Sequence, residues 1–129
     1  MNEDTIKAIL DEAREAADRA TKAVTPTPMV VGMGNLFDDS IVPGTEEIVE
    51  EGVCGYAWVK ISGRGKFAKY LKDQNMASKS CTGPGYIVWA TALQEYRGQS
   101  YERNQAGAAA VAGVFNKHGI KAQMFSRLD

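Results

Sequence analysis

The chain has 129 residues, a formal net charge of −1 and two cysteines. That length suits one domain with one hydrophobic core, and its composition is ordinary for a globular protein. The near-neutral charge gives no reason to expect a nucleic acid or a membrane as a partner, and two cysteines with one histidine are too few for a structural zinc site.

The first predicted element is a helix at residues 4–24. Its apolar side chains alternate in steps of four and three, which is the spacing of a heptad seam: Ile6, Leu10, Ala13, Ala17, Ala20 and Val24. Because the seam is mainly alanine, an isolated coiled coil would be weak. Two interpretations stay open. The helix packs on its own domain, or residues 1–24 form an arm that docks on a neighbouring subunit, with an interface made of Ile6, Leu10, Ala13 and Ala17.

Residues 25–51 are predicted to form an acidic linker that contains proline and glycine. The run Thr25-Pro26-Thr27-Pro28 ends the helix, because a residue before proline avoids the helical conformation. Val30-Val31 predicts a short strand, and turns are expected at Asp38-Asp39-Ser40 and Pro43-Gly44. Ile48-Val49 fits either a strand or a helical turn.

Residues 52–129 are predicted to form a compact domain with the order β-α-β-α-β. Strands are expected at 52–61, 86–92 and 120–125, and helices at 66–74 and 101–118. Neither the start of the chain nor any later run has the length and hydropathy of a signal peptide or a membrane span. The predicted fold class is α/β, in the α+β sense, with a small three-stranded sheet and helices packed on it.

The first strand of this domain alternates two apolar sets. Val53, Ala57, Val59 and Ile61 share one face, and Cys54, Tyr56 and Trp58 share the other. Because both sets are apolar, both faces of the strand are expected to be covered.

Charge is distributed unevenly along the chain. Residues 25–59 hold six acidic and no basic side chains, whereas residues 60–79 hold six basic and one acidic. The two segments could pair within one chain or between neighbouring copies in head-to-tail assembly. Alternatively, the basic segment could bind a phosphate-bearing ligand.

A candidate anion-binding loop is Ser62-Gly63-Arg64-Gly65-Lys66, between a predicted strand and a predicted helix. Backbone N–H groups at such a turn favour negative charge, and Arg97 and Arg103 are expected to contribute. The loop is not a Walker A motif, because Phe67 stands where a serine or threonine would hold magnesium. The alternative is an ordinary turn with no ligand.

Tyr96 and Tyr101, beside Arg97 and Arg103, have the composition of a recognition surface and are predicted interface residues; the alternative is the rim of a surface loop. His118 is expected to cap the end of the last helix. Cys54 is expected in the core and Cys81 in a loop, and the adjacent acidic pairs are expected in solvent. No catalytic residue, metal ligand or cofactor site is predicted.

Three strings resemble a family of small proteins encoded by tailed bacteriophages, notably those of actinobacteria. They are EGVCGYAWVKI at residues 51–61, QSYER at 99–103 and SRLD at 126–129. The resemblance covers roughly residues 50–129. It implies a phage origin and, for some members, a place in the virion; it carries over no catalytic residue.

We therefore expect a non-enzymatic phage structural or assembly protein that contacts its own copies or other virion proteins, in the virion or in the host cytoplasm. The alternative is a small protein that binds phosphate or a nucleotide, such as a factor that sequesters a ligand of host defence. No membrane partner is expected, and nothing in the sequence is direct evidence for nucleic acid.

Overall fold

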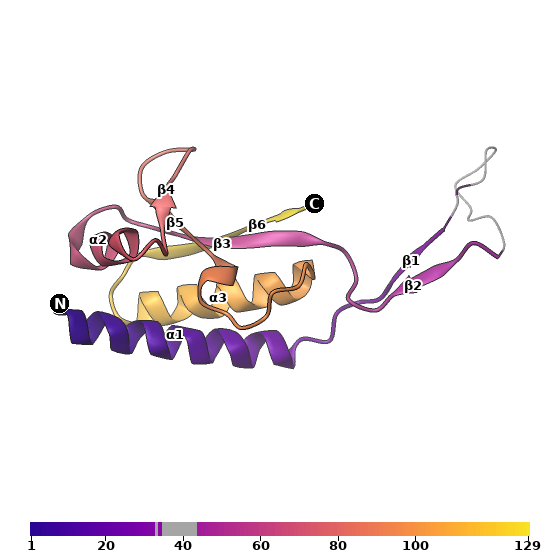
Figure 1. Cartoon of the computed structure of the whole chain (residues 1–129), viewed down its shortest axis with the longest axis horizontal. Helices are drawn as coiled ribbons and strands as arrows, with labels where there is room; N and C mark the ends of the chain where they lie inside the picture. The colour runs from indigo at the N-terminus through magenta and orange to yellow at the C-terminus, as the bar shows by residue number, and fades with distance from the viewer. Residues whose placement is uncertain (33, 35–43) are drawn as a thin grey trace.

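The computed structural model describes residues 1–32, 34 and 44–129 and has an α+β fold (Figure 1). The predicted turns at Asp38-Asp39-Ser40 and at Pro43 lie outside the described residues. The elements in chain order are α1 (Glu3–Ala23), β1 (Met29–Val31), β2 (Glu47–Val49), β3 (Gly55–Ile61), α2 (Gly65–Asp73), β4 (Ser78–Lys79), β5 (Tyr86–Trp89), the 3-10 helix η1 (Ala90–Ala92), α3 (Tyr101–Lys117) and β6 (Ala122–Leu128).

The main sheet has the strand order β4-β5-β3-β6, and every neighbouring pair is antiparallel. From β3 onward the elements follow the order β-α-β-β-α-β, which is the split βαβ or ferredoxin-like arrangement. The prediction of a three-stranded sheet with the order β-α-β-α-β therefore omitted one strand that the structure contains. The missing strand is β4, whose two residues are too few to leave an alternating pattern in the sequence.

The hydrophobic core lies between one face of the sheet and α3. Every second residue of β3 is buried, including Ala57, Val59 and Ile61, as the alternation predicts. On the helical side, Phe115 of α3 is fully buried and meets Phe67 of α2 edge-on, with ring centroids 5.0 Å apart. Because α2 and α3 share this contact, both helices cover the same face of the sheet.

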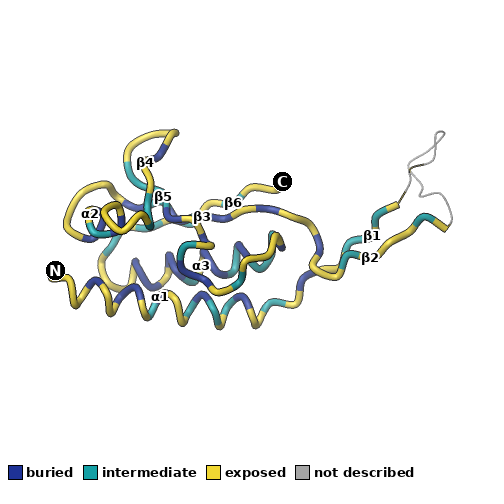
Figure 2. Tube along the Cα trace, viewed as in Figure 1, coloured by how far each residue is buried: buried dark blue, intermediate teal, exposed yellow. Residues whose placement is uncertain are grey.

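Helix α1 packs along α3 and is part of this core. Figure 2 shows its buried residues as a stripe on the side that faces α3. The seam residues Ile6, Leu10, Ala13 and Ala17 are all at most 3% exposed. The interpretation of residues 1–24 as an arm with an intermolecular interface is therefore wrong, and the alternative, packing on its own domain, is confirmed. Alanine allows this close approach because it leaves little side chain between the helices.

Several predicted boundaries move by a few residues. Strand β3 begins at Gly55 rather than at residue 52. Val53, predicted on the same face as Ala57, therefore precedes the strand and is exposed, and Cys54, predicted in the core, is exposed as well. A side chain at Gly55 would collide with the ring of Tyr101 and with the carbonyl of Arg127, so only glycine allows both neighbours to approach here. Strand β5 ends at Trp89 rather than at residue 92, and Ala90–Ala92 form η1.

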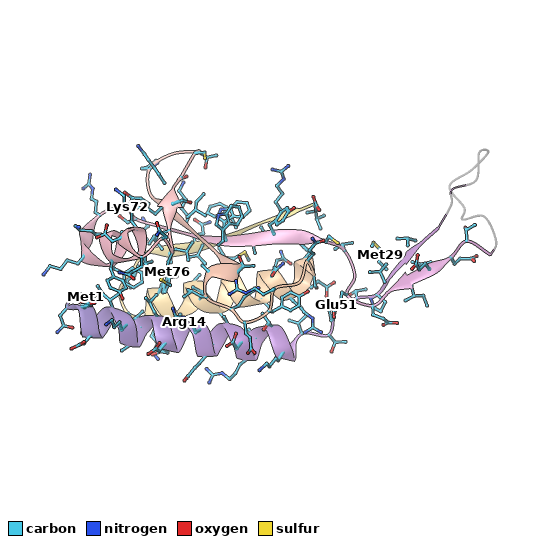
Figure 3. All side chains as sticks on the ribbon, viewed as in Figure 1. Met1, Arg14, Met29, Glu51, Lys72 and Met76 are labelled. Atoms are coloured by element: carbon cyan, nitrogen blue, oxygen red, sulfur yellow. The ribbon has the colours of Figure 1, made fainter. Side chains whose placement is uncertain are left out.

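Strands β1 and β2 form an antiparallel hairpin that projects from the body of the molecule (Figure 1). This hairpin lies within the predicted linker. Its base is held to α3 by a hydrogen bond from the Thr27 amide to Glu102 (3.1 Å) and by an ion pair between Glu51 and Arg103 (2.8 Å). Figure 3 shows Met29 and Glu51 at this end of the molecule and Lys72 of α2 at the other.

The contact between α1 and the end of α3 predicts a stability that depends on pH. Hydrogen bonds from His118 and Lys117 lower the pKa of the Glu12 carboxyl below its ordinary value of 4.5. The unfolded chain then binds more protons below that pH, so stability falls as the pH falls. In thermal melts, the advantage of the wild-type protein over Glu12→Gln should be present above pH 4.5 and shrink below it. A difference that grows on acidification would contradict the assignment. Glu15→Gln, at an exposed position of the same helix, is the control.

Candidate functional site

The face of the sheet opposite the helices is open. Residues that alternate with the buried positions of β3 point to this side, and Tyr56 is 46% exposed. Trp89 of β5 and Phe125 of β6 are 46% and 37% exposed. The expectation that both faces of the strand are covered is therefore wrong: all three helices contribute buried residues to one core, which leaves the aromatic face without a covering element in the described part of the chain.

Three rings from three strands form a continuous aromatic cluster on this face, made of Trp58, Trp89 and Phe125. Trp58 on the central strand β3 lies directly opposite Trp89 on β5 and opposite Phe125 on β6. Its ring centroid is 5.4 Å from that of Trp89 and 6.2 Å from that of Phe125, which is nearly parallel to it. Directly paired residues of antiparallel strands point to the same side, so the register brings the rings together.

Basic and amide side chains surround the aromatic cluster. Lys60 follows Trp58 two positions along β3 and therefore points to the same face; Gln123 of β6 lies opposite it. Arg127 of β6 lies opposite Tyr56. The four strands of the sheet contain no acidic residue at all. The face is thus aromatic at its centre and positively charged at its margins.

A groove of about 890 Å³ adjoins the aromatic cluster where β3 ends and β6 begins. We call it the basic groove, because Lys60, Arg64 and Lys121 line it and no acidic side chain does. Phe125 also lines it, so the aromatic cluster and the basic groove are one continuous surface.

A smaller hollow of about 380 Å³ lies at the opposite end of the open face. Tyr56, Trp89, Gly98 and Gln99 line it, together with Arg97. The guanidinium of Arg97 donates a hydrogen bond to the Thr91 carbonyl, which holds this cation beside Trp89.

The predicted anion-binding set does not form one site. Gly63 and Arg64 line the basic groove, and Gly65 begins α2. Lys66 is exposed beside Met1 and Tyr70, away from the groove. Arg97 lies at the other end of the open face, and Arg103 is already paired with Glu51, so the grouping of these four cations is wrong.

The predicted interface tyrosines are used within the chain. The Tyr96 hydroxyl accepts a hydrogen bond from the Ser100 amide, and its ring lies 5.8 Å from the Arg103 guanidinium. The Tyr101 hydroxyl is 2.9 Å from the Ser126 hydroxyl of β6. Both side chains are half-buried, and they fix the loop before α3 to the body rather than forming a free recognition surface.

The remaining candidates do not converge on a common centre. His118 is the C-cap residue of α3, as predicted, and its Nε2 lies 3.0 Å from Glu12. Cys54 and Cys81 are exposed free thiols. Glu46-Glu47 and Glu50-Glu51 lie on the projecting hairpin and the turn that follows it, and Asp38-Asp39 lies outside the described residues. Among residues 1–32, 34 and 44–129, no cluster of three or more ligating side chains could hold a metal ion.

Sequence reasoning placed none of Trp58, Trp89 and Phe125 in a site, and it also missed Lys60 and Lys121 of the basic groove. The alternation within β3 placed Tyr56 and Trp58 together on one face, which was the available signal. Their partners come from strands far away in the sequence, and only the register of the sheet joins them.

Comparison of the chain with models of protein families, with curated proteins and with solved structures gives no match. In the described part of the chain, no helix has both the length and the apolar character needed to cross a membrane.

Proposed function

We propose that this protein binds single-stranded nucleic acid on the open face of its sheet, with bases stacked on the aromatic cluster. The observation that carries the proposal is the row of Trp89, Trp58 and Phe125 on three adjacent strands. Exposed aromatic rings on the open face of a four-stranded sheet are how RNA-recognition motifs hold unstacked bases. A fold does not fix a function, so the proposal depends on these side chains and their charged surroundings.

The spacing of the rings favours a single strand over a duplex. Neighbouring centroids are 5.4 and 6.2 Å apart, whereas successive units of a duplex strand advance by about 3.4 Å. Bases that lie on neighbouring rings must therefore separate from one another. In a duplex the faces of the bases are covered by their neighbours, and aromatic side chains cannot reach them.

The net charge of −1 does not oppose this proposal, because the charges are separated in space. The sheet carries Lys60, Lys79 and Arg127 and no acidic residue. Acidic side chains are concentrated on α1 and on the hairpin, away from the open face. At physiological salt, charges farther away than about one Debye length, roughly 8–10 Å, are largely screened. A nucleic acid that approaches the open face is therefore attracted by the positive charge of that face, whatever the net charge of the protein.

The direct test is fluorescence anisotropy with labelled oligothymidylate and oligouridylate of about ten nucleotides, compared with a duplex of the same length. We expect binding of at least one single strand and much weaker binding of the duplex. Equal binding of both forms, or of neither, would refute the proposal. The two single strands distinguish a DNA ligand from an RNA ligand.

We also propose a second function, that of a phage assembly protein that forms head-to-tail contacts between copies. The specific observation is that the acidic hairpin and the basic groove lie at opposite ends of the molecule. Within residues 44–129, the acidic segment makes its ion pair through Glu51, whose partner is Arg103. Arg103 lies outside the basic segment 60–79, so the two segments do not pair with each other among these residues. The exposed side chains of Val30 and Ile48 on the hairpin supply apolar surface for such a contact. The resemblance of residues 50–129 to tailed-phage proteins agrees with this role.

This second function predicts association that weakens with salt. Light scattering after size exclusion should give a mass above that of one chain at low salt and a smaller mass at high salt, because charge-guided contacts are screened. Glu46→Gln with Glu47→Gln should reduce the low-salt mass. A strict monomer at every salt concentration would contradict head-to-tail assembly and leave nucleic-acid binding unaffected.

A further inference from the structure

The basic groove holds cations that form no ion pair with the residues the structure describes. Lys60, Arg64 and Lys121 make no ion pair with any residue in the described part of the chain, in contrast to Lys69 and Lys117, which are paired with Asp73 and Glu12. Three cations that line one groove repel one another, and no carboxylate in the lining compensates them. This arrangement is suited to an anionic occupant with several charges.

The groove and the aromatic cluster are joined at two points. Phe125 belongs to both, and Lys60 lies two residues from Trp58 on the same face of β3. Two residues of a strand span about 7 Å. That distance is comparable to the 5.4 and 6.2 Å between the rings themselves. A ligand stacked on Phe125 therefore has its next charged group within reach of the groove.

We propose that the basic groove binds phosphodiester groups of the same strand whose bases stack on the aromatic cluster. This inference rests on the proposed function and adds to it the path that the polynucleotide follows across the sheet. The polynucleotide crosses the sheet from β5 over β3 to β6 and leaves over the turn between β3 and α2. Lys60, Arg64 and Lys121 contact its backbone, and the smaller hollow beside Arg97 lies at the other end of this path.

The experiment measures how oligothymidylate affinity depends on salt, in the full-length protein. A groove variant combines Lys60→Gln, Arg64→Gln and Lys121→Gln. A control variant combines Lys7→Gln, Arg14→Gln and Lys22→Gln, which removes the same charge from exposed positions of α1, on the helical side of the sheet. Because a phosphate contact in a single strand contributes about 0.7 to the slope of log K against log salt, the groove variant should lower its magnitude by about 2. The control variant should leave the slope close to that of the wild-type protein.

The possible outcomes separate this inference from the function on which it rests. A slope lowered only in the groove variant supports the phosphate path. An unchanged slope in the groove variant, in a protein whose binding still depends on Trp58, overturns the phosphate path and retains the proposed function. An equal change in both variants shows general electrostatic attraction and overturns the path as well. If the wild-type protein binds no single strand, both proposals fail.

Discussion

Replacing Trp58 by alanine is expected to weaken the binding of single-stranded oligonucleotides by about 5- to 150-fold, since stacking of a base on an aromatic side chain contributes about 1–3 kcal/mol. Trp58 is the central ring of the aromatic cluster and contacts both of the others. Its loss should also disorder the rings of Trp89 and Phe125. Anisotropy titrations of the wild-type and variant proteins at one fixed salt concentration measure the effect.

Two further substitutions of Trp58 show whether aromatic stacking or apolar contact is responsible for the loss of affinity. Trp58→Tyr keeps a ring on which a base can stack and should retain much of the affinity. Trp58→Leu keeps apolar surface but has no aromatic face, so it should bind nucleic acid nearly as weakly as the alanine variant. If leucine and tyrosine behaved alike, the face would act as an apolar surface, and association with another protein would be the better explanation. The melting temperature should change little, because the cluster lies outside the buried core.

The sequence predicted the existence of β3 and its two faces from Gly55 onward, but not where the strand begins or which face would stay open. Alternation shows that Tyr56 and Trp58 point away from Val59 and Ile61. It does not show on which side the helices lie, and two apolar faces suggest a strand covered on both sides. Exposure of the aromatic face follows from the crossovers that place α2 and α3 on one side of the sheet, which is a property of the whole topology.

The net charge of the sequence likewise does not show how the charges are arranged in the fold. A net value of −1 averages the acidic hairpin with the basic groove, so the composition gave no indication of a polyanion as a ligand. The turn at Gly63 and Arg64 was identified from its place between a strand and a helix, which is local information. Lys121, which lines the same groove, comes from just before the last strand, and Lys66, adjacent in sequence, lies elsewhere. Long-range contacts between single side chains leave no signal in one sequence.

The position of α1 gives the prediction with the largest expected effect on stability. Leu10→Ala should destabilise the protein by about 2–5 kcal/mol, the usual cost of truncating a buried leucine. Total stabilities of single domains are only about 5–15 kcal/mol, so the melting temperature should fall by roughly 10 °C or more. Leu10 is 3% exposed in the described chain and belongs to the same core as Phe115 and Leu71. Glu15→Ala, at an exposed position of the same helix, should change the melting temperature by only about 2 °C or less.

The same pair of variants separates the two interpretations of the heptad seam. The apolar stripe of α1 is covered by α3 of its own chain, so truncating Leu10 weakens the monomer at every protein concentration. If α1 were an arm on a neighbouring subunit, the loss would depend on protein concentration, and the mass in light scattering would fall before the domain melted. A sequence pattern cannot distinguish these cases, because a helix presents the same seam to any partner. Covering the seam with α3 also explains why short alanines suffice: the helices belong to one chain, and their association does not have to overcome the entropy of bringing two molecules together.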